Sequence, residues 1–252
     1  MFSVHAYSAT VASSTAPTYT NLTPVSDPIL TISGSNFYVG ALNNLVGAYM
    51  IGATADKTKI ESPSILNFAP QQVTPVDDAA LPTDTLLHTT HPTSPIKLVT
   101  NEGINFQTSN FSTSATFDGV GLIALSDGAL APVDGDIRTI RATVTSGGSN
   151  DVWVNKALSF DTNLPAGSYN LVGARYENAH GKYFRIVFQG NASVRPGWVC
   201  VSDQDASDTP NMRRGKMGVW GNFTNFNPPS IDILDDGSAT AGVLYLDVIK
   251  TT

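Results

Sequence analysis

The chain contains only one cysteine among its 252 residues, Cys200, and this excludes a disulfide bond within the chain. Cys200 lies in the apolar run Trp198-Val199-Cys200-Val201, so we expect a small residue of the core and not a reactive thiol. No apolar run approaches the roughly 18 residues of a membrane-spanning helix. The start, residues 1–6, lacks the basic residues and apolar run of a secretory signal, so we expect no signal peptide.

Charged residues are also scarce. They make up 14% of the chain, against about 25% in a typical soluble domain. The formal net charge of −7 argues against nucleic-acid binding as the main task, because phosphate recognition needs concentrated Lys and Arg. Two interpretations of the low charge stay open. Either much of the surface contacts other protein, or the chain is a Thr-rich β protein with a neutral surface.

One basic cluster interrupts this pattern, formed by Arg213, Arg214 and Lys216 around Gly215. The simplest interpretation is a solvated loop. A contact with another subunit or with a genome is the alternative.

Helical periodicity is nearly missing. Residues 41–51 and 77–87 are the best helix candidates, and both fit poorly. Short runs of β-forming residues with turn signals between them dominate instead, and they predict seven or eight strands in each half of the chain. Sheets with that many strands avoid exposed edges by forming a sandwich or a closed barrel.

The pentapeptide NLVGA occurs twice, at Asn44 and at Asn170, which are separated by half the length of the chain. Similar runs follow both copies in the same order, and each half ends in an apolar, strand-like run, residues 119–125 and 242–249. A period of this length indicates a duplicated domain, because solenoid repeats are roughly 20–50 residues long. We therefore predict an all-β protein of two tandem domains.

The predicted boundaries follow composition. Residues 1–25 are rich in Ser, Thr and Ala and are predicted to form an extended N-terminal arm. Residues 26–127 form the first barrel, and residues 128–135, with small residues, Pro and Gly, form a linker. Residues 136–252 form the second barrel.

Candidate ligand-binding residues are few. His88 and His91 offer two metal ligands in a Pro-rich stretch with no third ligand nearby, so a polar loop is the simpler interpretation. The segment 203–208 has Asp203, Asp205 and Asp208 as oxygen ligands for calcium, but it lacks the Gly and distal Glu of an EF-hand loop.

Two further features have both a structural and a binding interpretation. Asp235-Asp236-Gly237 is first a turn signal and only second a cation site. Trp198 has two interpretations, a sugar-binding residue and a core or interface residue, and the second is favoured.

The sequence contains no Gly-rich phosphate loop and no G-x-S-x-G motif. We therefore predict no catalytic residues, no metal site and no cofactor, and hence a protein that is not an enzyme.

Three motifs carry a family resemblance: the two NLVGA copies, the run LPAGSYNLVGAR from Leu164 to Arg175, and GKYFRIVFQG from Gly181 followed by Arg195-Pro196-Gly197. With them the whole chain resembles the major capsid proteins of the double-jelly-roll lineage, found in tailless icosahedral viruses with an internal membrane. Its length is nearest to the compact, corticovirus-like members. The resemblance implies two tandem eight-stranded jelly-roll barrels, a homotrimeric, pseudo-hexagonal capsomer, and no catalytic residues.

The same resemblance implies that the protein is made in the host cytoplasm and ends in the capsid shell of the virion. Its implied partners are neighbouring capsomers and penton or minor capsid proteins. The arm of residues 1–25 would face inward, toward an internal membrane. Many relatives have longer loops that form towers, so this shorter chain implies a smooth or decorated outer surface. A minor capsid, spike or adhesion protein and a non-catalytic carbohydrate-binding β-sandwich module remain the alternatives.

Overall fold

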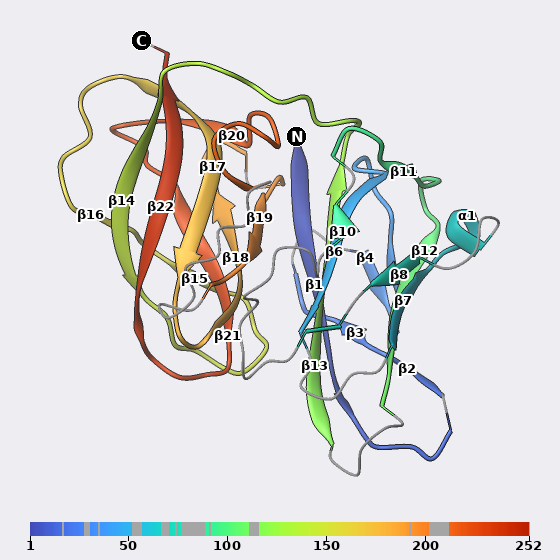
Figure 1. Ribbon diagram of the computed structural model, residues 1–252. Helices are drawn as coiled ribbons and strands as arrows, with labels where there is room; N and C mark the ends of the chain where they lie inside the picture. Colours follow the sequence, from blue (N-terminus) through green and yellow to red (C-terminus); the bar gives the residue numbers. More distant parts are fainter. Residues whose placement is uncertain are drawn as a thin grey trace. The chain divides into compact units, whose positions relative to one another are not determined.

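The computed structural model describes residues 1–16, 18–27, 31–34, 36–51, 57–66, 71–73, 75–76, 89–90, 92–110, 116–191, 193–201 and 212–251. These residues form an all-β structure of four sheets, with one short helix, α1 (Pro63–Leu66) (Figure 1). The chain divides into two compact units. We call His5–Ala129 the N-terminal unit, and Met1–Val4 together with Leu130–Thr252 the C-terminal unit.

The N-terminal unit contains two sheets. The first has the order β10-β6-β13-β1-β3, with β9 and β11 also paired to β6. Its strands are β1 (Phe2–Val11), β3 (Thr23–Pro24), β6 (Asn44–Ile51), β9 (Pro75–Val76), β10 (Thr89–Thr90), β11 (Ile96–Lys97) and β13 (Phe117–Ser126). Residues 2–4 of β1 belong to the C-terminal unit. The second sheet has the order β4-β5-β12-β7-β8, with β2 also paired to β12. Its strands are β2 (Tyr19–Asn21), β4 (Thr31–Ser33), β5 (Asn36–Tyr38), β7 (Lys57–Glu61), β8 (Gln71–Val73) and β12 (Gly103–Ser109).

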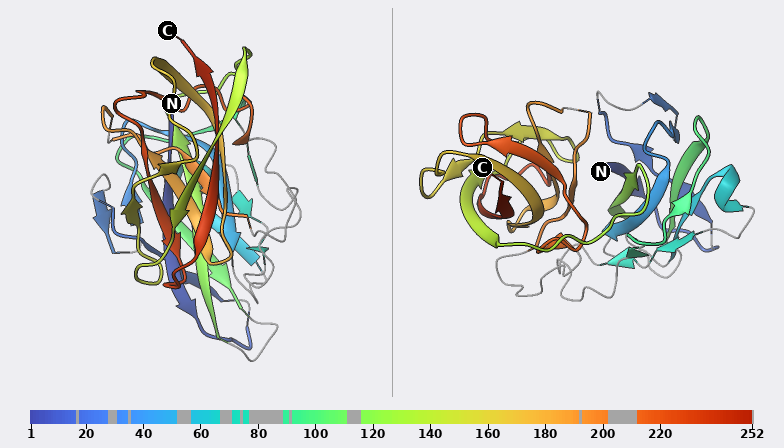
Figure 2. Two further views of the ribbon diagram at one scale, coloured as in Figure 1. Left: turned by 90° about the vertical axis from the view of Figure 1, so that its left-hand side faces the viewer. Right: turned by 90° about the horizontal axis from the view of Figure 1, so that it is seen from above.

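The C-terminal unit also contains two sheets, and Figure 2 shows its strands arranged around a common interior. The first sheet has the order β16-β14-β22-β17-β20 and the second the order β15-β21-β18-β19. The strands are β14 (Ile137–Thr145), β15 (Val154–Lys156), β16 (Ser159–Phe160), β17 (Ser168–Glu177), β18 (Gly181–Val187), β19 (Gly197–Val199), β20 (Gly221–Thr224), β21 (Ser230–Asp235) and β22 (Ala241–Lys250).

The two units share one strand order. We number the eight strands of the C-terminal unit along the chain, leaving out the short β16. The first sheet then has the order first–eighth–third–sixth, and the second sheet has the order second–seventh–fourth–fifth. The N-terminal unit has the same two orders when its short strands β2, β3, β4, β9 and β11 are left out. They are β1-β13-β6-β10 in its first sheet and β5-β12-β7-β8 in its second. Both NLVGA copies lie in the third strand, β6 or β17, and pair with the eighth, β13 or β22.

Alternating hydrophobicity explains how these strands form. In β22, Leu244, Leu246 and Val248 are buried, while Val243 and Tyr245 on the opposite face are only half-buried. Asp247, on that opposite face too, is the exception and is fully buried. A period of two places the apolar side chains on one face of the sheet. The N-terminal unit encloses its own core, in which Tyr7 packs against Phe37 and Phe106 with ring centroids 5.8 and 5.6 Å apart.

The first residues of the chain depart from the sequence-based expectation. Residues 1–25 were predicted to form an extended arm, but Phe2–Val11 form β1, and residues 2–7 are all buried. The apolar residues Phe2, Val4 and Ala6 alternate with Ser3, His5 and Tyr7. This alternation, which is typical of a strand, lies within a Ser- and Thr-rich stretch. Residues 2–11 are therefore part of a sheet and do not form an extended arm.

The two units are joined between Ala129 and Leu130, within the segment 128–135 that was predicted to be a linker. The described part of the chain contains no helix long and apolar enough to cross a membrane.

Candidate functional site

The candidate metal ligands lie mostly beyond the described structure. His88, His91 and the segment 203–208 all fall outside the described residues, so the expectation that neither place is a metal site stays a prediction. Among the residues that are described, no three His, Cys, Asp or Glu side chains come together as metal ligands.

Two of the three tryptophans are core residues. Trp198 in β19 is fully buried, which confirms its core interpretation over the sugar-binding one. Trp220 is also fully buried and packs edge-on against Phe2, with ring centroids 5.2 Å apart. Cys200 is a buried free cysteine, as predicted. Burial raises the pKa of its thiol well above the ordinary value, and the negative charge of Asp235 acts in the same direction.

The segment Asp235-Asp236-Gly237 forms a turn, the first of its two predicted interpretations. Asp235 accepts hydrogen bonds from the backbone N–H groups of Gly147, at 2.7 Å, and Gly237, at 2.9 Å. Gly237 has a φ of 91°, a conformation that favours glycine. Asp236 accepts a hydrogen bond from the Ser238 N–H and lies 2.8 Å from Nδ1 of His180. The carboxylates therefore hold the turn together.

The repeated pentapeptide forms the same irregularity in both units. In β6, Leu45 pairs with Leu125 and Gly47 with Ala124, so Val46 between them is unpaired in a β-bulge. In β17, Leu171 pairs with Val248 and Gly173 with Asp247, and Val172 is bulged in the same way. A bulge bends its strand and strengthens the local twist. The NLVGA repeat therefore encodes one structural feature twice.

Arg213 of the basic cluster is not a solvated residue. Its guanidinium donates to both carboxylate oxygens of Asp247, through Nε at 2.7 Å and Nη2 at 3.0 Å. Asp247 also accepts hydrogen bonds from Thr139 Oγ1, at 2.7 Å, and from the Arg214 N–H, at 2.8 Å. Burial alone would raise the pKa of Asp247, but these donors outweigh it and leave the pKa below its ordinary value. The side chains of Arg214 and Lys216 are exposed, so only part of the cluster is solvated.

A second ionic group lies inside the C-terminal unit. Asp232 Oδ2 accepts from Arg185 Nε at 2.7 Å and from Arg195 Nη1 at 3.0 Å, and Oδ1 accepts from Asn155 Nδ2 at 2.7 Å. The Arg185 guanidinium also lies 4.3 Å from the centre of the Trp153 ring, a cation–π contact. Arg185 and Asp232 are both buried, and their ion pair joins β18 to β21.

Arg195 also holds the first residues of the chain through its backbone. Its N–H donates to Ser3 Oγ at 2.8 Å, and its carbonyl accepts from the Val4 N–H at 3.0 Å. With the packing of Phe2 on Trp220, these bonds fix residues 2–4 within the C-terminal unit. Sequence reasoning missed this docking because no local signal links residue 3 to residue 195.

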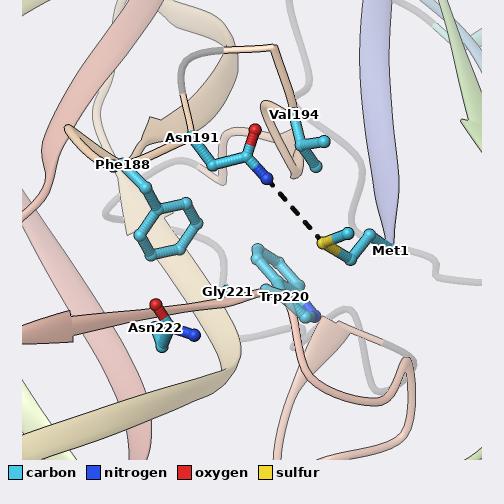
Figure 3. Close-up of a pocket in the computed structure, with 8 residues that line it drawn as sticks. Met1, Phe188, Asn191, Val194, Trp220, Gly221 and Asn222 are labelled. Carbon is cyan, nitrogen blue, oxygen red and sulfur yellow. Dashed lines mark hydrogen bonds between the residues drawn. The ribbon is translucent and has the colours of Figure 1, made fainter.

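A pocket of about 110 Å³ opens beside these residues. It is lined by Met1, Phe188, Gly190, Asn191, Val194, Trp220, Gly221 and Asn222 (Figure 3). Asn191 Nδ2 lies 3.9 Å from the sulfur of Met1, and the two side chains point toward each other at one side of the pocket. The lining has apolar side chains and neutral amides but no charged side chain, so it suits an apolar group better than an ion.

No protein-family model matches the chain, and no curated protein matches its sequence. The fold has weak similarity to two solved structures. One is the major capsid protein P2 from Bacteriophage PM2, with 8% sequence identity, a TM-score of 0.25, and coverage of 100% of this chain and 98% of that one. The other is the STIV MCP, with 7% identity, a TM-score of 0.25, and coverage of 99% and 97%. At these values neither similarity establishes a family or a function for this chain.

Proposed function

We propose that the chain is a structural major capsid protein that forms homotrimeric, pseudo-hexagonal capsomers of an icosahedral virion. The observation that carries the proposal is the strand order shared by the two units, first–eighth–third–sixth in one sheet and second–seventh–fourth–fifth in the other. Eight antiparallel strands in two Greek-key sheets make a jelly roll, an architecture of viral capsid and lectin domains. Two such units in one chain are a double jelly roll.

The duplication itself favours a building block over a binding module. Three copies of a chain with two like units present six like units, which can surround a threefold axis with a nearly hexagonal outline. Symmetric contacts between such tiles generate closed assemblies. The bulges at Val46 and at Val172 support this view, because both units have the same bend in the corresponding strand.

The chemistry of the described residues fits a structural role. Two of the most buried carboxylates, Asp232 and Asp247, are bound by arginines and by neutral donors, so their charges serve to hold strands together. The low content of charged residues, 14%, suits a surface that is largely covered by other subunits.

The proposed partners are further copies of the chain, neighbouring capsomers and penton or minor capsid proteins. The chain would be made in the host cytoplasm and would end in the shell of the virion. Contact with an internal membrane is proposed only for the part of residues 1–25 beyond β1. The apolar side chains of Phe2, Val4 and Ala6 are already buried in protein.

The native mass of the purified chain tests this proposal. Light scattering should give three times the 26.6 kDa of one chain, and negative-stain images of the same sample should show six-lobed particles or closed shells. A stable monomer that never assembles would contradict the proposal. A monomer that bound glycans on an array would favour the carbohydrate-binding alternative.

A further inference from the structure

The most exposed large apolar side chain among the described residues is Phe226, at 88%. It lies in the turn between β20 and β21, where the Asn227 N–H donates to the Thr224 carbonyl at 3.1 Å. Asn225 fixes this turn to Gly167 by two bonds. Its N–H donates to the Gly167 carbonyl at 3.2 Å, and its side-chain oxygen accepts from the Gly167 N–H at 3.0 Å. The ring of Phe226 is therefore presented to solvent by an ordered turn.

The pocket beside Trp220 has the properties of a receptor for such a ring. Phe188, Val194 and Trp220, all buried, contribute apolar lining, and Met1 adds a flexible thioether that is 48% exposed. Its volume of about 110 Å³ is of the same order as the apolar cavity of about 150 Å³ that is known to admit benzene. Because Phe226 is almost fully exposed, it does not occupy the pocket of its own chain.

We propose that Phe226 of one copy inserts into the Met1/Phe188/Val194/Trp220 pocket of a second copy. The inference rests on the proposed capsid function, and it names the contact that anchors the capsomer. The inserting residue and its receptor are different residues, so copies can repeat the contact head-to-tail. Such a contact generates a ring when its rotation closes, and a threefold ring uses three identical insertions.

Charge favours this pair of surfaces. Two copies of a chain with a net charge of −7 repel each other, so a contact between them is least costly where no carboxylate is present. Residues 224–229 around Phe226 carry no charged side chain, and neither do the residues that line the pocket. The neutral amides of Asn191 and Asn222 supply the polar groups typical of an interface rim.

The surface area that Phe226 can bury shows how much of the interface between two copies it can form. One phenylalanine buries about 150–250 Å², whereas a stable interface needs about 800 Å² from each partner. Phe226 is therefore an anchor within a larger interface, and aromatic anchors in desolvated pockets supply a disproportionate share of binding energy.

Two substitutions test the contact from its two sides. Phe226→Ala removes the inserting ring from an exposed turn. Gly190→Phe adds a ring at the pocket, where a Cβ atom on Gly190 would meet no atom within 4 Å and the fold should therefore be preserved. Each should raise the concentration at which half of the trimer dissociates by about 30-fold or more, measured by sedimentation equilibrium. Gly190→Ala and Val99→Ala, the second at a side chain that is 64% exposed, are the matched controls and should stay trimeric.

Mixing the Phe226→Ala and Gly190→Phe chains tests the insertion more directly than either variant alone. The Phe226→Ala chain keeps an intact pocket, and the Gly190→Phe chain keeps an intact Phe226, so one insertion remains possible between them. At a concentration at which each variant alone is dissociated, an equimolar mixture should form a dimer with one copy of each variant. Circular dichroism of both variants should match the parent chain.

The outcomes separate this inference from the function on which it rests. If the parent chain forms trimers and Phe226→Ala or Gly190→Phe forms them equally well, the insertion is wrong and the capsid proposal stands. A mixture of dissociated variants that forms no dimer would also overturn the insertion. If the parent chain itself stays monomeric, the capsid proposal fails and the insertion fails with it.

Discussion

Gly173 of β17 lies opposite Asp247 of β22, directly after the bulged residue Val172. A Cβ atom on Gly173 would approach the Arg214 nitrogen and the Met212 oxygen to 2.8 Å. The loop that Asp247 binds through Arg213 therefore passes against a residue that has no side chain. The bulge, the glycine and the buried carboxylate together fix the position of the 212–216 loop on the sheet.

The first prediction concerns this close approach. Gly173→Val should destabilise the C-terminal unit by about 3 kcal/mol or more, because the neighbouring atoms are backbone and cannot move aside easily. The measurement is the free energy of unfolding in urea. Gly128→Ala is the control, since a Cβ at Gly128 meets no atom within 4 Å, and it should change the stability by less than about 1 kcal/mol. Equal stabilities of the two variants would show that the loop is not packed against Gly173.

The second prediction concerns the buried ionic group at Asp232. Asp232→Ala leaves Arg185 buried without its carboxylate, which should cost about 3–5 kcal/mol of folding stability. The matched control is Asp161→Ala, which removes the partner of Arg141 from an exposed pair and should cost less than about 1 kcal/mol. Thermal and urea unfolding of both variants give the comparison. Similar losses in the two variants would mean that burial of the Asp232 group is not what stabilises it.

The third prediction is a pH dependence that originates in Asp247. Its pKa is lower in the folded state than its ordinary value of 3.8, because Arg213, Thr139 and the Arg214 N–H bind the ionised form. A lowered pKa stabilises the fold above the ordinary pKa, and this contribution is lost as the pH falls through the folded-state value. Asp247→Asn should therefore be less stable than the parent at pH 7, and the difference should shrink as the pH falls below about 4.

Urea midpoints measured across that pH range test this prediction. Asp136→Asn serves as the control, because Asp136 and Arg138 form a pair on the surface and should contribute little at any pH. A difference between the parent and Asp247→Asn that stays constant with pH would contradict the assignment to Asp247.

The sequence predicted the features that are encoded locally. Short runs of β-forming residues with turn signals between them indicated an all-β chain. The NLVGA repeat indicated a duplication, and its two copies turn out to be bulged third strands. Trp198 and Cys200 were correctly assigned to the core because they lie in an apolar run. These signals extend over a few residues, so a single sequence is enough to detect them.

The features that the sequence did not predict depend on contacts between distant residues. Arg213 resembled a solvated basic residue because its partner, Asp247, lies 34 residues further along the chain. Ser3 and Arg195 are 192 residues apart. The exposure of Phe226 also depends on packing, since an aromatic residue in a turn has no periodicity that distinguishes a buried side chain from an exposed one.

The fourth prediction separates a docked N-terminal strand from an extended arm. Phe2→Ala should destabilise the C-terminal unit by about 3–5 kcal/mol, because Phe2 is fully buried against Trp220. Thr15→Ala is the control within the segment first predicted to be an arm, and its exposed side chain should contribute less than about 0.5 kcal/mol. Trp220 also serves as a reporter, since losing the ring of Phe2 should shift the fluorescence of the folded protein. If Phe2→Ala changes neither the stability nor the fluorescence, then residues 1–4 are not docked in solution, and the arm predicted from composition describes them better.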